Sequence, residues 1–193
     1  MLDLNKYPSL KYLLFGSLYF SEGLLLALST VILIIYFTQK DISIATATLV
    51  GGIAYIPWIL KFVFGPITDY FIKYGRKPFI TIGGILGAVF LFPIAVIDPK
   101  IALIPFTLLL FISHTFIVLL DVSADAWAIQ ISKVHERGKV NASMTGGIFG
   151  GSAFGSIVLA IIANNIGFDI VFITSGLIVL LTIILPFLIK EKK

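Results

Sequence analysis

The chain has 193 residues, of which 59% are hydrophobic and 12% are charged, and its formal net charge is +4. Its mean hydropathy is +1.08, whereas an average soluble domain is about 25% charged and about half apolar. A soluble core of this size could not bury so much apolar surface, so lipid must be the solvent for most of the chain. The chain has no cysteine, which excludes disulfides and thiolate metal sites, and we expect no metal and no cofactor.

Six runs of about 20 uncharged or nearly uncharged residues are long enough to cross a bilayer as helices. The expected spans are residues 11–37, 44–66, 79–97, 101–124, 140–163 and 169–189. The first run is longer than the roughly 7 to 15 residues of a signal-peptide core, so we expect it to be a span. The sequence therefore predicts an all-α polytopic membrane protein that forms one six-helix bundle over residues 1–193.

An even number of spans places both termini on the same side of the membrane. Eleven of the 14 Lys and Arg residues fall on that side, Lys40 and Lys100 fall on the other, and Lys61 lies inside the second span. The positive-inside rule therefore predicts a multi-pass protein of the cell membrane with both termini in the cytoplasm. Because the basic residues follow the pattern that this topology requires, we expect no nucleic-acid partner.

Two three-helix units of inverted topology are common in transporters, and here they would comprise roughly residues 1–97 and 98–193. The sequence evidence for such a repeat is one short match: GGIA at 51–54 and GGIF at 146–149 both fall in the middle helix of a unit.

The fifth expected span carries small residues at every fourth position, namely Ser143, Gly147, Gly151 and Gly155. This spacing forms one smooth stripe on which another helix backbone can pack closely. Two interpretations remain open at this point: a close helix contact, or a sliding surface that faces a cavity or a second half.

Ionisable groups inside a bilayer are costly, which makes them the first candidates for function. Glu22 lies eleven residues after Lys11, a rise of about 16 Å, and it shares a broad helical face with Tyr19. Lys61 lies at a similar depth, about 12 Å from the expected edge at Asp69, so a Glu22–Lys61 ion pair is expected to be possible. Glu22 could bind substrate, carry a proton or only pair with a neighbouring helix, and Lys61 could attract an anionic solute or extend to the inner surface.

The fourth expected span brings three ionisable residues onto one face. His114, Asp121 and Asp125 are spaced by seven and four residues, which places them within about 40° of each other on a helix. Two carboxylates one turn apart require a partner, and Arg76 and Lys77 are the candidates in a neighbouring loop. His114 is either a packed histidine with satisfied hydrogen bonds or a proton relay.

The same residues argue against an enzyme. Intramembrane aspartyl proteases need their two aspartates on different helices, whereas Asp121 and Asp125 share one. The further Asp, Gly and Arg residues that lipid phosphotransferases need at set spacing are also missing. We therefore expect no catalysis.

The stretch GPITDYFIKYGRKP, Gly65 to Pro78, is a basic hinge between the second and third spans. It resembles the loop motif of the major facilitator superfamily, usually Gly-x-x-x-Asp-Arg-x-Gly-Arg-Lys. It departs from the motif at Tyr70, which replaces the usual Arg, and in the three extra residues between Asp69 and Gly75. The extended form is similar to the branch of muropeptide permeases and acetyl-coenzyme A transporters, as are LYFSEGLLLAL at 18–28 and DVSADAWAIQ at 121–130.

The resemblance implies half of a twelve-helix fold in which a solute cavity lies between two six-helix bundles. It implies a gating motif whose positions here are Gly65, Asp69, Gly75, Arg76 and Lys77. The aspartate of the motif caps a helix of the other bundle, and its arginine links to an acid at the end of the fourth helix, which here would be Asp121 or Asp125. Glu22 and Leu25 depart from the residues usual at their positions, and the fifth helix lacks the Gly-Pro element of drug antiporters.

Together these features predict a half-size secondary carrier for a small anionic or amphiphilic solute, with protons as a possible coupling ion. It would work by alternating access and would need a second half, either another copy of itself or a separate C-terminal chain. The alternative is a non-transporting membrane protein, a remnant or an assembly partner, that keeps the fold.

Overall fold

The computed structural model describes residue 4 and residues 9–191. Within these residues, six helices are long and apolar enough to cross a membrane. Their bounds are Ser9–Gln39, Ile44–Tyr70, Lys77–Val96, Leu103–Ile131, Val134–Asn165 and Phe168–Leu188. The six expected spans are therefore confirmed, and the largest difference is that the fourth continues to Ile131 instead of ending at residue 124.

Most of the spans consist of more than one regular segment. The segments in chain order are α1 (Ser9–Ala27), η1 (Leu28–Ile32), α2 (Leu33–Gln39), α3 (Ile44–Ile59), α4 (Lys61–Tyr70), η2 (Ile72–Tyr74), α5 (Lys77–Val89), η3 (Phe92–Val96), α6 (Leu103–Ile131), η4 (Val134–Glu136), α7 (Arg137–Phe154), η5 (Gly155–Leu159), α8 (Ala160–Asn165), α9 (Phe168–Thr182) and α10 (Ile184–Leu188). Of these, η1 and η5 are single π-helical turns, which interrupt the first and fifth spans, and such turns are frequent at functional sites.

The second span is interrupted at Leu60, where α3 ends and α4 begins. Pro66, in the second turn of α4, has no backbone N–H to donate to the carbonyl of Phe62, and a proline kinks or breaks a helix in the turn that precedes it. The break makes Lys61 the first residue of a new helical segment.

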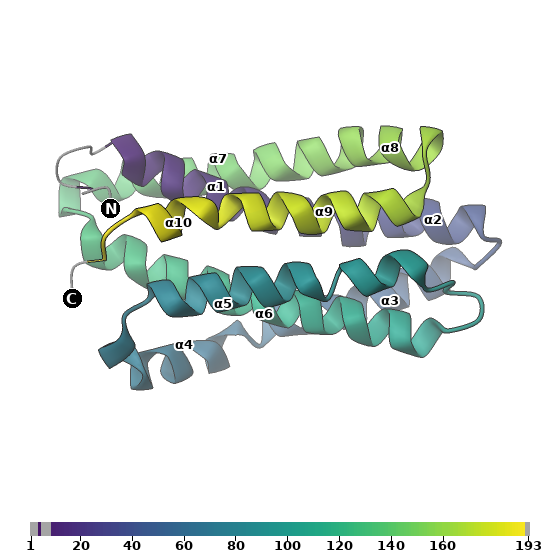
Figure 1. Cartoon of the computed structure of the whole chain (residues 1–193), viewed down its shortest axis with the longest axis horizontal. Helices are drawn as coiled ribbons and strands as arrows, with labels where there is room; N and C mark the ends of the chain where they lie inside the picture. Colours follow the sequence, from purple (N-terminus) through teal and green to yellow (C-terminus); the bar gives the residue numbers. More distant parts are fainter. Residues whose placement is uncertain (1–3, 5–8, 192–193) are drawn as a thin grey trace.

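The close contact between the first and fifth spans explains the stripe of small residues. A Cβ on Gly147 would overlap the backbone oxygen of Gly16, and a Cβ on Gly151 would overlap the backbone oxygen of Phe20. The stripe therefore faces α1 along its length, as Figure 1 shows for α1 and α7. The close-packing interpretation is confirmed, and the interpretation of the stripe as a cavity-facing surface is wrong.

The other spans pack around α6, which contacts α3, α4 and α5, while α9 packs on α5. Aromatic side chains fill the core near the α2 end, where the Tyr36 ring stacks on Phe168 with 4.4 Å between centroids. A second core near the chain termini contains Phe15 and Trp127, whose rings meet edge to face.

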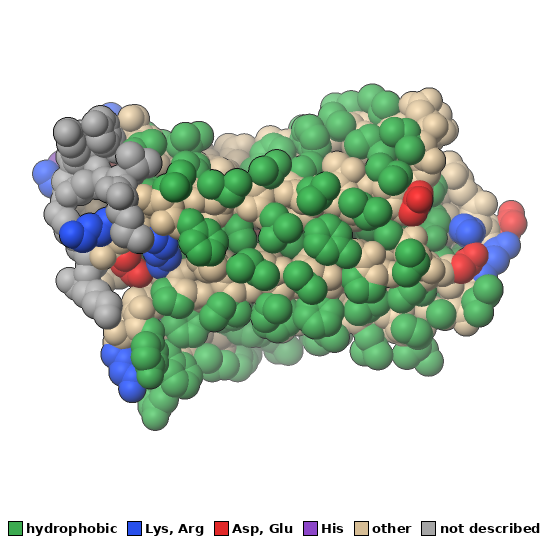
Figure 2. Space-filling view, in the orientation of Figure 1, with side chains coloured by type: hydrophobic (Ala, Val, Ile, Leu, Met, Phe, Trp, Pro, Cys, Tyr) green, Lys and Arg blue, Asp and Glu red, His purple; other side chains and the backbone are tan. Residues whose placement is uncertain are grey.

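The beginning of α1 and the end of α10 lie at one end of the bundle, with the 70–76 and 132–136 segments (Figure 1). We call this the terminal end, and the other the opposite end. Figure 2 shows charged side chains at both ends of the visible face and a hydrophobic band between them, as expected for a protein in a bilayer.

Ion pairs join the loops at the opposite end. Lys40 Nζ lies 2.9 Å from Asp98 Oδ2, and Lys100 Nζ lies 3.2 Å from Asp41 Oδ2. The hydrogen bond from Lys40 lowers the pKa of Asp98 below its ordinary value, so this carboxylate keeps its charge at neutral pH.

Candidate transport site

The structure brings polar side chains from three spans together at membrane depth, some of them buried and some partly exposed. Lys61, at the start of α4, places its Nζ 3.1 Å from Asp121 Oδ2 and 3.7 Å from Asp125 Oδ2. Both carboxylates are carried by α6, one turn apart. The expectation that Arg76 or Lys77 would pair with them is wrong, because the helix break at Leu60 places Lys61 beside them instead.

The first span contributes Tyr19 and Glu22 to the same group. Tyr19 is buried and donates its hydroxyl proton to Asp125 Oδ1. Glu22 lies one turn further along α1, close enough to interact electrostatically with Asp121, Asp125 and Lys61. We call these five residues the carboxylate cluster.

The Glu22–Lys61 ion pair considered from the sequence is not formed. No described basic side chain lies within 4.0 Å of the Glu22 carboxylate, and its Oε2 atom is buried without a hydrogen-bond partner. Lys61 instead reaches across to α6, where two carboxylates one turn apart attract it more strongly than one does.

The carboxylate cluster has three acidic groups and one basic group. Asp121 and Asp125 are about 6 Å apart between Cβ atoms, and two unit charges at that distance repel by about 3 kcal/mol at an effective dielectric constant of about 20. One lysine cannot neutralise three carboxylates, and an unpaired charge inside a membrane costs several kcal/mol. The cluster therefore needs a proton or another cation.

His114 is fully buried on α6 and has both ring nitrogens occupied. Its Nδ1 accepts a hydrogen bond from Trp58 Nε1 at 2.9 Å, and its Nε2 lies 2.9 Å from Ser29 Oγ. An indole N–H can only donate, so Nδ1 is unprotonated and Nε2 carries the hydrogen that it donates to Ser29. His114 is thus a neutral residue whose hydrogen bonds join three spans, as the packed interpretation expects, and the proton relay stays a prediction.

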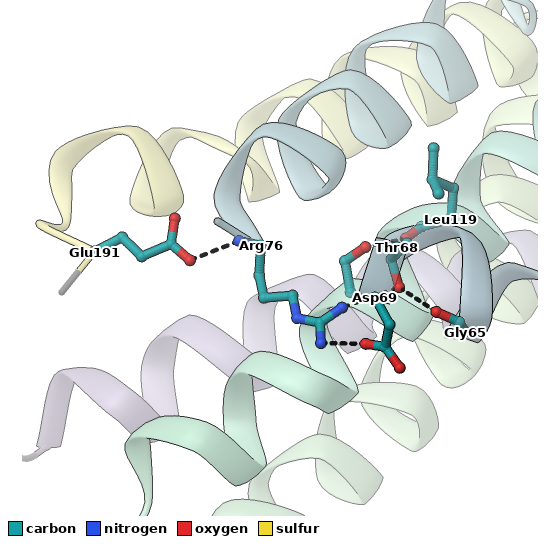
Figure 3. A network of polar contacts seen from close by, with 7 residues as sticks. Gly65, Thr68, Asp69, Arg76, Leu119 and Glu191 are labelled. Atoms are coloured by element: carbon teal, nitrogen blue, oxygen red, sulfur yellow. Dashed lines mark hydrogen bonds and ion pairs between the residues drawn. The ribbon is translucent and has the colours of Figure 1, made fainter. Parts of the chain in front are cut away.

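The basic hinge forms a second polar network, at the terminal end (Figure 3). The Arg76 guanidinium pairs with Asp69 and donates through Nη1 to Thr68 Oγ1 at 3.0 Å. Thr68 in turn donates to the carbonyl of Gly65 at 3.0 Å. The expected link from Arg76 to Asp121 or Asp125 is wrong, since Asp69, seven residues away on α4, is within its reach.

Glu191, which the sequence analysis did not single out, holds the other side of the hinge. Its carboxylate accepts hydrogen bonds from the backbone N–H groups of Arg76 at 2.6 Å and Lys77 at 3.2 Å. Gly75 adopts φ = +87° beside this carboxylate, a region that favours glycine, and a Cβ there would overlap Glu191. An isolated acid among three C-terminal lysines was the signal in the sequence that could have pointed to it.

Lys77 completes a reciprocal contact between the third and sixth spans. Its Nζ donates to the carbonyls of Phe187 at 3.1 Å and Ile189 at 2.8 Å. A carboxylate therefore caps the N-terminus of α5, while a lysine caps carbonyls at the C-terminal end of α10, and both charges match the helix dipoles that they face.

The sequence matches the profile of the Major Facilitator Superfamily over residues 15–193. The chain belongs to the major facilitator superfamily. Its fold is similar to the inward-open xylose transporter XylE from E. coli, with a TM-score of 0.64 and 18% identity over 95% of this chain and 47% of that chain. It is also similar to a D-xylose–proton symporter, with a TM-score of 0.60 and 17% identity over 94% of this chain and 46% of that chain.

The chain thus spans about half the length of these solved structures. The all-α fold of six membrane helices, corresponding to half of a major facilitator fold, is confirmed. Proteins of this superfamily are typically membrane carriers rather than enzymes. The resemblance to the muropeptide permease and acetyl-coenzyme A transporter branch stays a prediction.

Proposed function

We propose that this chain is one half of a secondary active carrier that moves a small solute by alternating access, with a proton taken up and released at the carboxylate cluster. The observation that carries the proposal is the imbalance of charge inside the bundle. Lys61 pairs with two carboxylates, Asp121 and Asp125, and a third, Glu22, has its Oε2 buried without a partner. Catalysis forms no part of this proposal.

A proton suits this site better than a fixed second cation. Protonation of one carboxylate removes a charge where burial and like-charged neighbours both disfavour the ionised form. Loss of that charge would also weaken the hold on Lys61, whose side chain is 47% exposed and can move. A site that changes its ion pairing on protonation can bias the equilibrium between two bundle arrangements.

The solute is proposed to be small and amphiphilic. Attraction of an anionic solute was one of the two roles considered for Lys61, but Lys61 pairs with Asp121 and Asp125. The cluster repels an anion, so an anionic group on the solute would have to bind outside the cluster.

The orientation follows from the positive-inside rule. We propose a protein of the cell membrane with the terminal end, and both termini, in the cytoplasm. The division into inverted units at about residue 97 also stays a proposal, which the pairing of α1 with α7 and of α3 with α6 supports. A non-transporting remnant is the alternative.

Proteoliposomes with an imposed pH gradient test the proposal. A screen of labelled peptides, sugars and acyl carriers would identify a solute that accumulates. Glu22→Gln should then abolish accumulation driven by the pH gradient but leave solute exchange at equal pH, because the amide cannot release a proton. Asp41→Asn, which removes an exposed carboxylate at the opposite end, is the matched control and should behave as wild type. Full gradient-driven accumulation by Glu22→Gln would contradict proton coupling at this cluster.

A further inference from the structure

A pocket of about 180 Å³ lies between the end of α6 and the beginning of α7. Half of its lining side chains are apolar and half are polar. The apolar ones are Ala128, Ile129, Val140 and Met144, and the polar ones are Asp125, Ser132, Arg137 and Asn141. Such a lining suits a polar group carried on an apolar chain.

The α7 side of the pocket is basic. Arg137 is the first residue of α7, and Asn141 lies one turn later on the same face. The adjacent acid, Glu136, is paired with Lys11 at 2.9 Å, and no described acidic side chain lies within 4.0 Å of Arg137. The N-terminal amides of this helix add to the positive potential, so this side attracts an anion.

Ser132 supplies an independent sign of a ligand. Its side chain is buried, with 6% of the residue exposed, and its Oγ has no hydrogen-bond partner among the described residues. A buried hydroxyl left without a partner costs about 1–3 kcal/mol. Ser132 lines the pocket, so a rotation of its side chain about χ1 would bring the hydroxyl to a ligand oxygen there and remove this cost.

Asp125 lines the other side of the pocket and would repel an anion. Its charge is already shared, because Oδ1 accepts from Tyr19 and Oδ2 lies 3.7 Å from Lys61. The remaining repulsion from Asp125 would direct a bound anion toward Arg137. The pocket therefore adjoins the carboxylate cluster at Asp125, and at its Arg137 side it offers the anion site that the cluster lacks.

We infer that this pocket is a subsite for the carboxylate or phosphate of an amphiphilic molecule, with Arg137, Asn141 and Ser132 as its ligands. The inference rests on the proposed function, since it names the class of group that the carrier would take. The pocket is smaller than the about 300–1,000 Å³ of a whole ligand site, so it holds one group of a larger molecule. That molecule is either a transported solute or a lipid whose headgroup enters from the membrane.

Octanoate binding to the assembled protein in phosphatidylcholine nanodiscs, measured by calorimetry, tests the inference. Wild type should bind octanoate saturably and in preference to octanol and octyltrimethylammonium. Arg137→Gln should weaken octanoate binding at least tenfold, Arg137→Lys should restore part of it, and Ser132→Ala should weaken it less. Lys139→Gln removes the same charge two residues away at a position outside the pocket, so it should bind as wild type.

Nanodiscs that contain phosphatidylglycerol distinguish the two sources. If the anionic lipid displaces octanoate through Arg137, the natural occupant is a headgroup; if octanoate binds equally well there, it is a soluble anion. Either result supports an anion subsite. Absence of saturable octanoate binding, or equal losses in Arg137→Gln and Lys139→Gln, would overturn it. Because this measurement needs no pH gradient, it can fail while Glu22-dependent accumulation persists, and the reverse also holds.

Discussion

Arg76 shows how much of the hinge depends on one side chain. It contacts Asp69 and Thr68 through its guanidinium and Glu191 through its backbone N–H. The guanidinium is largely buried, whereas the Asp69 side chain is 67% exposed. Removing the arginine should therefore cost more stability than removing the aspartate.

Charge reversal tests the Arg76–Asp69 pair. Arg76→Asp should lower the unfolding temperature in detergent, because two carboxylates then face each other, and Asp69→Arg should restore part of the loss in the double variant. The coupling free energy should be about 0.2–1 kcal/mol, since one partner is exposed. Asp121→Arg in the Arg76→Asp background is the control and should give no rescue. Rescue by Asp121→Arg in place of Asp69→Arg would contradict the pairing.

At the residue scale, the sequence identified the charged residues that the structure brings together better than it predicted which of them pair. Glu22, Lys61, Asp121 and Asp125 stood out because a charge in an apolar run is rare. Their pairing depends on how far each helix is rotated and on the break at Leu60, which composition and spacing do not determine. Because Glu22 and Lys61 lie at a similar depth, the sequence indicated Glu22 as an ion-pair partner of Lys61. In the structure Lys61 contacts the two aspartates instead.

At the scale of elements, the contact between α1 and α7 is the most demanding in the bundle. Backbone lies against backbone at Gly147 and Gly151, which leaves no space for a Cβ. The four-residue spacing of small residues predicted this contact because it depends on periodicity alone. The π-helical turns η1 and η5 were not predicted, since their sequences contain no feature that distinguishes them from the α-helix around them.

Two neighbouring glycines provide a matched test of this contact. Gly151→Ala should destabilise the protein by about 1–3 kcal/mol, because the new methyl group overlaps the Phe20 backbone and forces the helices apart. Gly150→Ala meets only the Phe20 ring at 3.8 Å, so it should be neutral or stabilise the helix by up to about 1 kcal/mol. Thermal unfolding in one detergent compares the two. Equal effects would show that helix propensity, not the α1–α7 contact, controls stability here.

At the scale of the whole molecule, the bundle leaves charged side chains partly exposed at membrane depth. The second and fifth spans are the least buried of the six, and the second carries Lys61, which with Asp125 is nearly half exposed. Charged groups at this depth are not stable against lipid. The chain also spans about half the length of two solved structures with a similar fold. The proposed function therefore predicts another six-helix unit that covers the exposed parts of these two spans.

Site-directed cross-linking tests for that unit and uses the absence of cysteine from the chain. A photoreactive maleimide on Phe149→Cys, an exposed position of the fifth span, should capture a partner, whereas the same probe on Leu177→Cys, an exposed position of the sixth span, should meet lipid. Native mass spectrometry should then show either twice the 21.1 kDa of this chain or a complex with a different chain. A product at Phe149→Cys whose mass is twice that of the chain would identify a homodimer. A strictly monomeric mass with no product at either position would favour the non-transporting alternative, because a single bundle leaves Lys61 and Asp125 without the cover that a transport pathway requires.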